Sequence, residues 1–206
     1  EFAEDVDAWL PQDLLASCVD AELQPYGFES HPAGDFHVGV DFGKHQDYSV
    51  VAVIDRKGEK LNLVHIHRFP LETAYASVIG FVKALSDRWR SVQAVYCDVT
   101  GTGEYIVEDM IRSGILNVKG VKFTVESKEN MASILKDRMA RNSFRMPYDR
   151  EVINELNVER YELVKTGHIQ FSHPTGTWDD RFWATALAVM AVAEAPLPAR
   201  PVSRAF

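Results

Sequence analysis

The sequence predicts a mixed α/β domain in which a central sheet, three antiparallel strands followed by parallel strands, is flanked by helices. Two patterns predict it. Short runs of β-branched and aromatic residues dominate up to residue 66, and helical segments alternate with strand-like segments from residue 71 onward. The chain has 206 residues, of which 46% are hydrophobic and 25% are charged. This composition is typical of a single globular domain with one hydrophobic core.

Three strands are expected over residues 36–41, 48–54 and 60–66, where Val, Ile, Phe and Tyr are frequent. The second and third are separated by residues 55–59, which contain Gly58 and are typical of a hairpin connection. An antiparallel meander is therefore the simplest arrangement of these strands.

Beyond residue 70 the pattern alternates between helix and strand. Residues 71–89 place apolar side chains three or four positions apart, which indicates a helix with one buried face. Further strands are expected over residues 92–97, 118–125 and 168–171, and further helices over residues 104–112, 128–142, about 149–164 and from 179 onward. Because helices connect successive strands, we expect those strands to pair in parallel.

Three segments differ in composition. Residues 1–34 are acidic, contain a helical stretch near residues 11–24 followed by several Pro and Gly residues, and are interpreted as a linker or docking arm. Residues 35–195 form the expected α/β domain, and residues 196–206 form a Pro-rich tail. Because the chain begins at Glu1 rather than Met, we expect a further domain before it.

The charge is unevenly distributed. The net charge is -8, but residues 1–35 contain nine of the 30 acidic residues and none of the 22 basic ones, so the remainder has 21 acidic against 22 basic residues. A nearly neutral body does not exclude a nucleic-acid partner, whose phosphates are bound through Lys and Arg. Cys18 and Cys97 are expected to be reduced and buried, and no apolar run approaches membrane-spanning length. We therefore expect a soluble, cytoplasmic protein without a membrane partner.

Four acidic residues stand where the expected elements end or begin. Asp41 ends the first strand, Asp98 ends the fourth, and Asp179 and Asp180 open the last helix. Ligand sites of open α/β sheets lie beyond the carboxyl ends of the parallel strands, so these side chains can meet at one edge of the sheet. Carboxylates suit Mg²⁺ or Mn²⁺, and two such ions roughly 3.5–4 Å apart can support phosphodiester hydrolysis. The sequence therefore predicts a metal site.

The four acids are assigned different roles. Asp41 comes from the central strand and is expected to bridge two ions, with Asp98 and Asp180 completing the coordination. Asp179 is a ligand, an outer group or the helix cap. Taken singly, each acid also has a structural explanation, because carboxylates commonly end strands, open turns and occupy the first turn of a helix.

Three segments resemble the nuclease motifs of the large terminase subunits of tailed bacteriophages, which are ribonuclease-H-like proteins. They are Asp41-Phe-Gly-Lys44-His-Gln-Asp47-Tyr-Ser-Val-Val, Asp98-Val-Thr-Gly-Thr-Gly103 and Trp178-Asp179-Asp180-Arg-Phe-Trp-Ala-Thr-Ala-Leu-Ala. The resemblance spans most of residues 36–193. It departs at Trp178, where a His is common, and at Trp183, where many members carry a further Asp.

The resemblance implies a ribonuclease-H-like, metal-dependent endonuclease domain that cuts concatemeric double-stranded viral DNA during genome packaging in the host cytoplasm. It also implies a missing N-terminal ATPase domain and contacts with other packaging-motor components such as the portal and the small terminase subunit. Low sequence specificity is expected, because no separate base-reading motif is present. Two Mg²⁺ or Mn²⁺ ions are expected when DNA is bound.

Several basic residues are candidates for contacting DNA phosphates. One lies in the turn after the first acid, and the others lie in or after the expected helix over residues 128–142. They are Lys44, Lys128, Lys136, Arg138, Arg141 and Arg145. A merely solvated turn and helix face would show the same pattern.

Three other functions fit parts of the sequence. A nucleotide-binding domain of the actin or sugar-kinase type would use Asp41 and the turn at Gly101 and Gly103 for phosphates, although such domains normally contain two related halves and no repeat is found here. A resolvase-like or transposase-like nuclease would use the same acids on another DNA substrate. In a non-catalytic docking module the acids would be vestigial.

Overall fold

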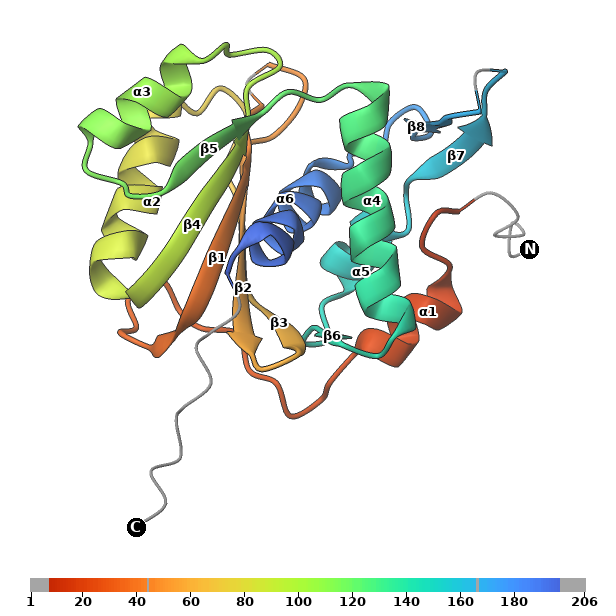
Figure 1. The fold of residues 1–206 in the computed structure, drawn as a ribbon, viewed down its shortest axis with the longest axis horizontal. Coiled ribbons are helices and arrows are strands. Elements are labelled where there is room, and N and C mark those ends of the chain that lie inside the picture. Colours follow the sequence, from red (N-terminus) through yellow and green to blue (C-terminus); the bar gives the residue numbers. More distant parts are fainter. Residues whose placement is uncertain (1–7, 44, 166, 197–206) are drawn as a thin grey trace.

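The computed structural model describes residues 8–43, 45–165 and 167–196. Its centre is a six-stranded sheet with the strand order β5-β4-β1-β2-β3-β6 (Figure 1). The strands of this sheet are β1 Ala33–Asp41, β2 Val50–Lys57, β3 Lys60–Arg68, β4 Arg90–Asp98, β5 Val118–Val121 and β6 Phe144–Arg145. A two-stranded sheet pairs β7 Arg160–Leu163 with β8 Ile169–Ser172. The helices are α1 Gln12–Cys18, α2 Tyr75–Arg88, α3 Tyr105–Arg112, α4 Val125–Ala140, α5 Arg150–Leu156 and α6 Asp180–Glu194.

β1 lies inside the sheet and pairs on both sides. It runs antiparallel to β2 and parallel to β4, and β2 runs antiparallel to β3. β5 pairs in parallel with β4 after the crossover through α3. The predicted order of antiparallel and then parallel strands is confirmed, as is the neighbouring position of the first and fourth strands.

Helices cover both faces of the sheet (Figure 1). α2 and α3 pack on one face, where Val38 and Val53 of the strands join Val82 and Met110 of the helices in one apolar cluster. α6 lies against the other face, and α4 and α5 pack on α6. The helix that carries Asp180 is therefore enclosed between the sheet and an outer layer of helices.

α6 lies close to β1 because Gly39 has no side chain. A Cβ at Gly39 would lie 2.0 Å from the backbone oxygen of Ala184 and 2.5 Å from the backbone nitrogen of Ala188. All residues of α6 from Asp180 to Val192 are buried. Gly39 thus sets how closely the start of α6 approaches the end of β1.

The helix expected over residues 149–164 is wrong beyond Leu156. There α5 ends, and the chain forms β7, which pairs antiparallel with β8 around a turn at Gly167, where φ is +85°. Tyr161 of β7 packs edge-on against Trp9, with 5.3 Å between the ring centroids. This partner lies about 150 residues away in the sequence, so a local helical pattern contains no information about it.

The boundary between β5 and α4 also differs from expectation. The Thr124 hydroxyl accepts a hydrogen bond from the backbone nitrogen of Ser127 at 3.1 Å, and this cap starts the helix at Val125. The strand expected over residues 118–125 is correspondingly shorter. The two-residue strand β6, parallel to β3, was not expected from the sequence.

Residues 8–34, which the sequence assigns to the arm, pack on the domain. Leu10 and Leu15 are fully buried, and the Trp9 indole donates a hydrogen bond to the backbone oxygen of Ala132 in α4 at 3.0 Å. The packed structure therefore extends to residue 8, because these apolar side chains complete the core under α4. The first seven residues of the arm and the tail from residue 197 lie outside the described residues.

Two further sequence predictions concern the state of the cysteines and the absence of a membrane-spanning segment. Cys18 and Cys97 are free and buried, as expected. Within the described part of the chain, no helix is long and apolar enough to cross a membrane.

Candidate metal centre

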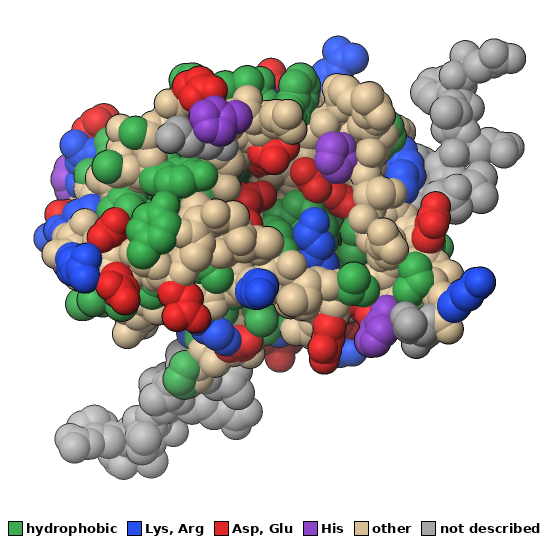
Figure 2. All heavy atoms as spheres, turned by 90° about the horizontal axis from the view of Figure 1, so that it is seen from above, with side chains coloured by type: hydrophobic (Ala, Val, Ile, Leu, Met, Phe, Trp, Pro, Cys, Tyr) green, Lys and Arg blue, Asp and Glu red, His purple; other side chains and the backbone are tan. Residues whose placement is uncertain are grey.

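The acids singled out in the sequence converge at one edge of the sheet. β1 and β4 are paired in parallel up to Val40 and Cys97, so Asp41 and Asp98 end neighbouring strands at the same edge. Asp179 is the N-cap residue of α6 and Asp180 its first residue, and both act electrostatically on Asp41 at this edge. Figure 2 looks onto this side of the molecule and shows acidic side chains gathered around a hollow near its middle, with a basic side chain beside them.

Asp41 is buried and lies among the negative charges of the other three acids. Its pKa is raised well above the ordinary value, first by burial and then by the negative charges of Asp180, Asp98 and Asp179, while Lys128 opposes the rise. Four carboxylates from three separate segments therefore lie close enough to repel one another.

Asp98 is oriented by the turn that follows β4. Its Oδ1 accepts hydrogen bonds from the backbone nitrogen of Thr100 at 2.8 Å and from the Thr100 hydroxyl at 2.5 Å. Burial raises the pKa of Asp98, and these bonds and Lys128 oppose that effect. The Thr100 oxygen also accepts from the Phe123 backbone nitrogen at 2.7 Å, which ties this turn to the segment leading into α4.

Asp180 has a carboxylate oxygen that remains available. The residue is 3% exposed, and its Oδ2 has no hydrogen-bond partner among the described residues. Burial raises the pKa of Asp180 to about 7, with Asp179 and Asp47 adding to the rise and a backbone hydrogen bond from Tyr48 opposing it. A buried, unpaired carboxylate oxygen is costly unless a cation or proton satisfies it.

Asp179 differs from Asp180 because its carboxylate already has a hydrogen-bond donor. Its Oδ2 accepts a hydrogen bond from the Trp183 indole at 2.7 Å, and its Oδ1 lies 3.7 Å from Nε2 of His173. Asp179 occupies the N-cap position of α6, but its carboxylate makes no capping hydrogen bond to the helix. Trp183, at one of the departures from the family motif, thus orients the first acid of the pair.

Glu159 belongs to the same cluster and was missed in the sequence. It is 1% exposed, neither of its carboxyl oxygens has a hydrogen-bond partner among the described residues, and burial together with Asp179 raises its pKa to about 9. The expected helix over residues 149–164 hid it, because a Glu inside an amphipathic helix gives no signal of burial. A break at the end of α5 would have placed it directly before a strand.

The side chains present fit a hard divalent cation. Carboxylate oxygens are the ligands that Mg²⁺ and Mn²⁺ prefer, and Asp41, Asp98 and Asp180 supply them from two strands and a helix. In the described part of the chain, no three His, Cys, Asp or Glu side chains are already arranged to hold an ion. The carboxylates would therefore have to move together when a cation binds.

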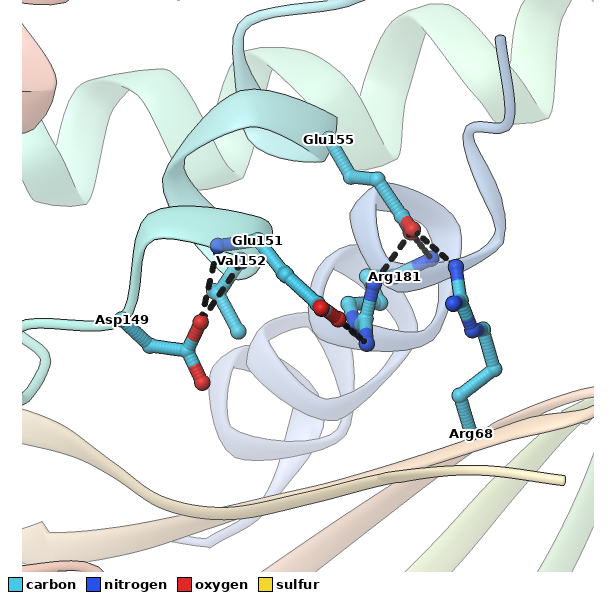
Figure 3. Close-up of polar contacts among 6 residues, drawn as sticks. All are labelled: Arg68, Asp149, Glu151, Val152, Glu155 and Arg181. Carbon is cyan, nitrogen blue, oxygen red and sulfur yellow. Dashed lines mark hydrogen bonds and ion pairs between the residues drawn. The ribbon is translucent and has the colours of Figure 1, made fainter.

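An ion-pair network centred on the buried Arg181 and Glu155 supports the start of α6 (Figure 3). Arg181, directly after Asp180, points between Glu151 and Glu155 of α5, and Arg68 of β3 reaches Glu155 from the sheet. Arg68 lies 2.7 Å from Glu155 Oε1, and Arg181 lies 2.9 Å from Glu151 Oε2. Asp149 caps α5 through the backbone nitrogen of Glu151 at 2.9 Å, which fixes the helix that carries both glutamates.

The basic residues predicted to contact DNA do not form one surface. Lys128 acts on the acids and lies 4.2 Å from the centroid of the Trp183 ring, whereas Lys136 packs over Trp9 at 4.2 Å. Arg138 and Arg141 line a separate hollow near the C-terminal end of α4, about 15 Å along the helix axis from Lys128.

Arg145 and Lys44 are the two remaining candidates for contacting DNA. Arg145 bonds to Asn142 and to its neighbour's backbone oxygen in β6. Lys44 lies outside the described residues.

Sequence comparison identifies a family over most of the chain. The family described as Terminase RNaseH-like domain matches residues 38–192. The large terminase subunit of Thermus virus P23-45 is 30% identical over 131 residues, which cover 64% of this chain and 26% of that protein. The chain thus spans about a quarter of the length of the curated relatives it matches.

Comparison with solved structures agrees with the family match. The crystal structure of the large terminase nuclease from the thermophilic phage G20c with bound magnesium has a TM-score of 0.75 and 24% identity, covering 90% of this chain and 97% of that one. The HK97 bacteriophage large terminase has a TM-score of 0.64 and 10% identity, covering 88% and 43%. At these identities the likeness establishes the fold alone, and the family description identifies that fold as ribonuclease-H-like. The family match covers residues 38–192, and the shared fold agrees with it. The chain therefore belongs to the terminase RNaseH-like domain family.

Proposed function

We propose that this domain is a metal-dependent endonuclease that cuts double-stranded viral DNA during genome packaging. The observation that carries the proposal is the convergence of Asp41, Asp98 and Asp180, from two strands and a helix. Burial raises the pKa of all three, the charges of Asp180 and Asp98 add to the rise at Asp41, and one Asp180 oxygen is free of hydrogen bonds among the described residues. Membership of a terminase family and the magnesium-bound structure of the phage G20c nuclease support it.

The acids take different parts in this proposal. Asp41 ends the central strand and lies near the other three acids, so it would be shared between two Mg²⁺ or Mn²⁺ ions, and Asp98 and Asp180 would supply further ligands. Bound divalent cations would supply an activated water and stabilise the leaving oxygen of the phosphodiester. Asp179, held by Trp183, positions the start of α6 and is not the main ligand.

The surrounding residues prepare the acids for this task. Thr100 holds one Asp98 oxygen toward the turn, so that carboxylate cannot rotate freely. Lys128 partly offsets the negative charge of Asp41 and Asp98 and is the basic residue best placed to meet a DNA phosphate at the site. Burial of Asp41 and Asp180 keeps water from screening their attraction to a cation.

The wider biological role extends beyond this domain. The relatives are about four times longer than the matched segment, so we propose that an ATPase domain precedes this nuclease and that the portal and the small terminase subunit are its partners in the motor. We propose double-stranded DNA as substrate, with low sequence specificity, and action inside the host cell.

Cleavage of supercoiled plasmid by the purified chain tests the proposal. With Mg²⁺ or Mn²⁺ the wild type should produce nicked and linear DNA, and EDTA should abolish this activity. Asp41→Asn and Asp98→Asn should reduce the rate at least 100-fold, whereas Asp109→Asn, which alters an exposed acid on α3 paired with Arg112, should leave it unchanged. Full activity in EDTA would overturn the metal mechanism, and tight ATP binding without DNA cleavage would favour the nucleotide-binding alternative.

A further inference from the structure

Trp178 differs from the other tryptophans in its exposure. It is 39% exposed, whereas Trp9, Trp89 and Trp183 are 7%, 0% and 2% exposed. Trp178 directly precedes Asp179 and Asp180, which belong to the acid cluster. An exposed indole is a large, rigid apolar surface that a flat ligand can cover.

A series of side-chain contacts leads from the Trp178 indole to the core of the domain. The Trp178 ring packs edge-on against Tyr48, with 5.4 Å between the centroids. The Arg68 guanidinium lies 4.4 Å from the centroid of the Tyr48 ring, and Arg68 in turn pairs with the buried Glu155 at 2.7 Å. Tyr48 thus contacts the exposed ring directly, and Arg68 and Glu155 support Tyr48.

The same contacts place the ring beside the reaction. A backbone hydrogen bond links Tyr48 to Asp180, and Trp178 is adjacent in sequence to Asp179. A DNA strand whose phosphate lies at these acids therefore brings its neighbouring nucleotides to Trp178. Phosphates do not suit the negative face of an aromatic ring, whereas every nucleobase has a π-face that stacks on it.

We propose that Trp178, supported by Tyr48 and Arg68, is a stacking platform for an unpaired nucleobase next to the phosphate that is cut. The inference rests on the proposed nuclease function and specifies its substrate. A base can stack on Trp178 only when it leaves its own stack in the duplex. The domain therefore favours DNA that is frayed, mismatched or single-stranded at the point of cleavage over fully paired DNA, without reading its sequence.

Binding of short labelled DNA by the whole chain tests the platform. Stacking of a base on an aromatic ring contributes to affinity by a factor of about 5 to 140. Trp178→Ala should weaken binding of a duplex with a central mismatched bubble about tenfold, and binding of the fully paired duplex less than twofold. Trp178→Phe should retain most of the affinity for the bubble. Tyr148→Ala, which removes a 72% exposed aromatic ring elsewhere on the surface, should change neither.

The indole itself provides a second readout. Because the other three tryptophans are buried, the bubble DNA should quench the Trp178 part of the emission, and Trp178→Phe should remove the quenching while binding persists. Equal affinity of the wild type for bubble and paired DNA would overturn the proposal. So would a Trp178→Ala variant that is folded and binds both DNAs as the wild type does, a result that would point instead to a protein segment covering this ring.

Failure of the stacking platform can be distinguished from failure of the nuclease proposal. Mg²⁺ binding and plasmid cleavage are measured on the wild type in parallel. Cleavage without any Trp178 effect rejects only the platform. Absence of metal-dependent cleavage, with Mg²⁺ binding also absent, rejects the nuclease function itself.

Discussion

The Trp183 indole donates a hydrogen bond to Oδ2 of Asp179 at 2.7 Å. This contact distinguishes two acids that are adjacent in the sequence, because Asp180 keeps an oxygen without a partner among the described residues. The acid whose oxygen is already occupied orients the helix start, and the acid with the free oxygen is available to a cation. The sequence motif alone left the choice between them open.

Substitution of each acid of the pair should therefore give unequal effects. Asp180→Asn should abolish Mg²⁺ binding, measured by calorimetry, and lower the cleavage rate at least 100-fold. Asp179→Asn keeps an oxygen that can accept from Trp183, and it should bind Mg²⁺ within about fivefold of the wild type. The reverse order of the two variants would contradict this assignment of roles.

Metal-free stability should fall as the pH rises. The pKa of Asp180 is about 7 in the folded protein against an ordinary value of 3.8, so between these values the folded state binds more protons than the unfolded chain. Stability is therefore lost through this window, and it is lowest where the carboxylates are all charged. Mg²⁺ relieves the repulsion, so the rise in melting temperature on adding Mg²⁺ should be several degrees larger at pH 8 than at pH 5.

Two buried histidines change the stability with pH in the direction opposite to Asp180, so the experiment needs a control for them. The pKa values of His37 and His65 are lowered by burial, so these groups cost stability only as the pH falls below 6.5. The difference between melting temperatures with Mg²⁺ and with EDTA removes their contribution. An Mg²⁺-induced rise of the same size at pH 5 and pH 8 would contradict the role assigned to the acids.

Gly39 should be intolerant of any side chain. Its Cβ would lie 2.0 Å from the backbone of Ala184, so Gly39→Ala must displace α6 and should lower the free energy of unfolding by about 3 kcal/mol or more. Gly80→Ala is the matched control, because a Cβ there meets nothing within 4 Å inside α2. It should stabilise the protein by about 0.5–1 kcal/mol. Urea unfolding measures both, and equal effects would show that β1 and α6 do not pack as described.

The basic residues of α4 should differ in their effect on DNA. Lys128 acts on Asp41 and Asp98, whereas Arg141 is 74% exposed and pairs with Asp137. Lys128→Ala should weaken DNA binding several-fold and reduce its salt dependence, while Arg141→Ala should change binding by less than twofold. Binding titrations at two salt concentrations decide between them. A larger effect of Arg141 would restore the continuous basic surface expected from the sequence.

The parts of the site predicted from the sequence are those with local signals. Asp41 and Asp98 follow short apolar strands, and the parallel pairing of those strands follows from the helix between them. Asp180 opens a helix whose apolar length is evident in the sequence. Local pattern and topology were thus enough to bring these three acids to one edge.

The parts that were missed depend on contacts distant in the sequence. Glu159 is buried beside Asp179 and Trp183, and Trp9 is buried against α4 and against Tyr161. Lys136 looked like a DNA contact because its partner, Trp9, comes from a segment interpreted as a linker. Tertiary packing decided these positions, and no periodicity within either segment encodes it.

Diffraction from a crystal soaked in Mn²⁺ tests the central claim most directly. The anomalous signal should show at least one peak within coordination distance of the Asp41, Asp98 and Asp180 carboxylates, and an Asp180→Asn crystal soaked in the same way should lose it. Peaks elsewhere on the molecule, with none at these three side chains, would contradict the account.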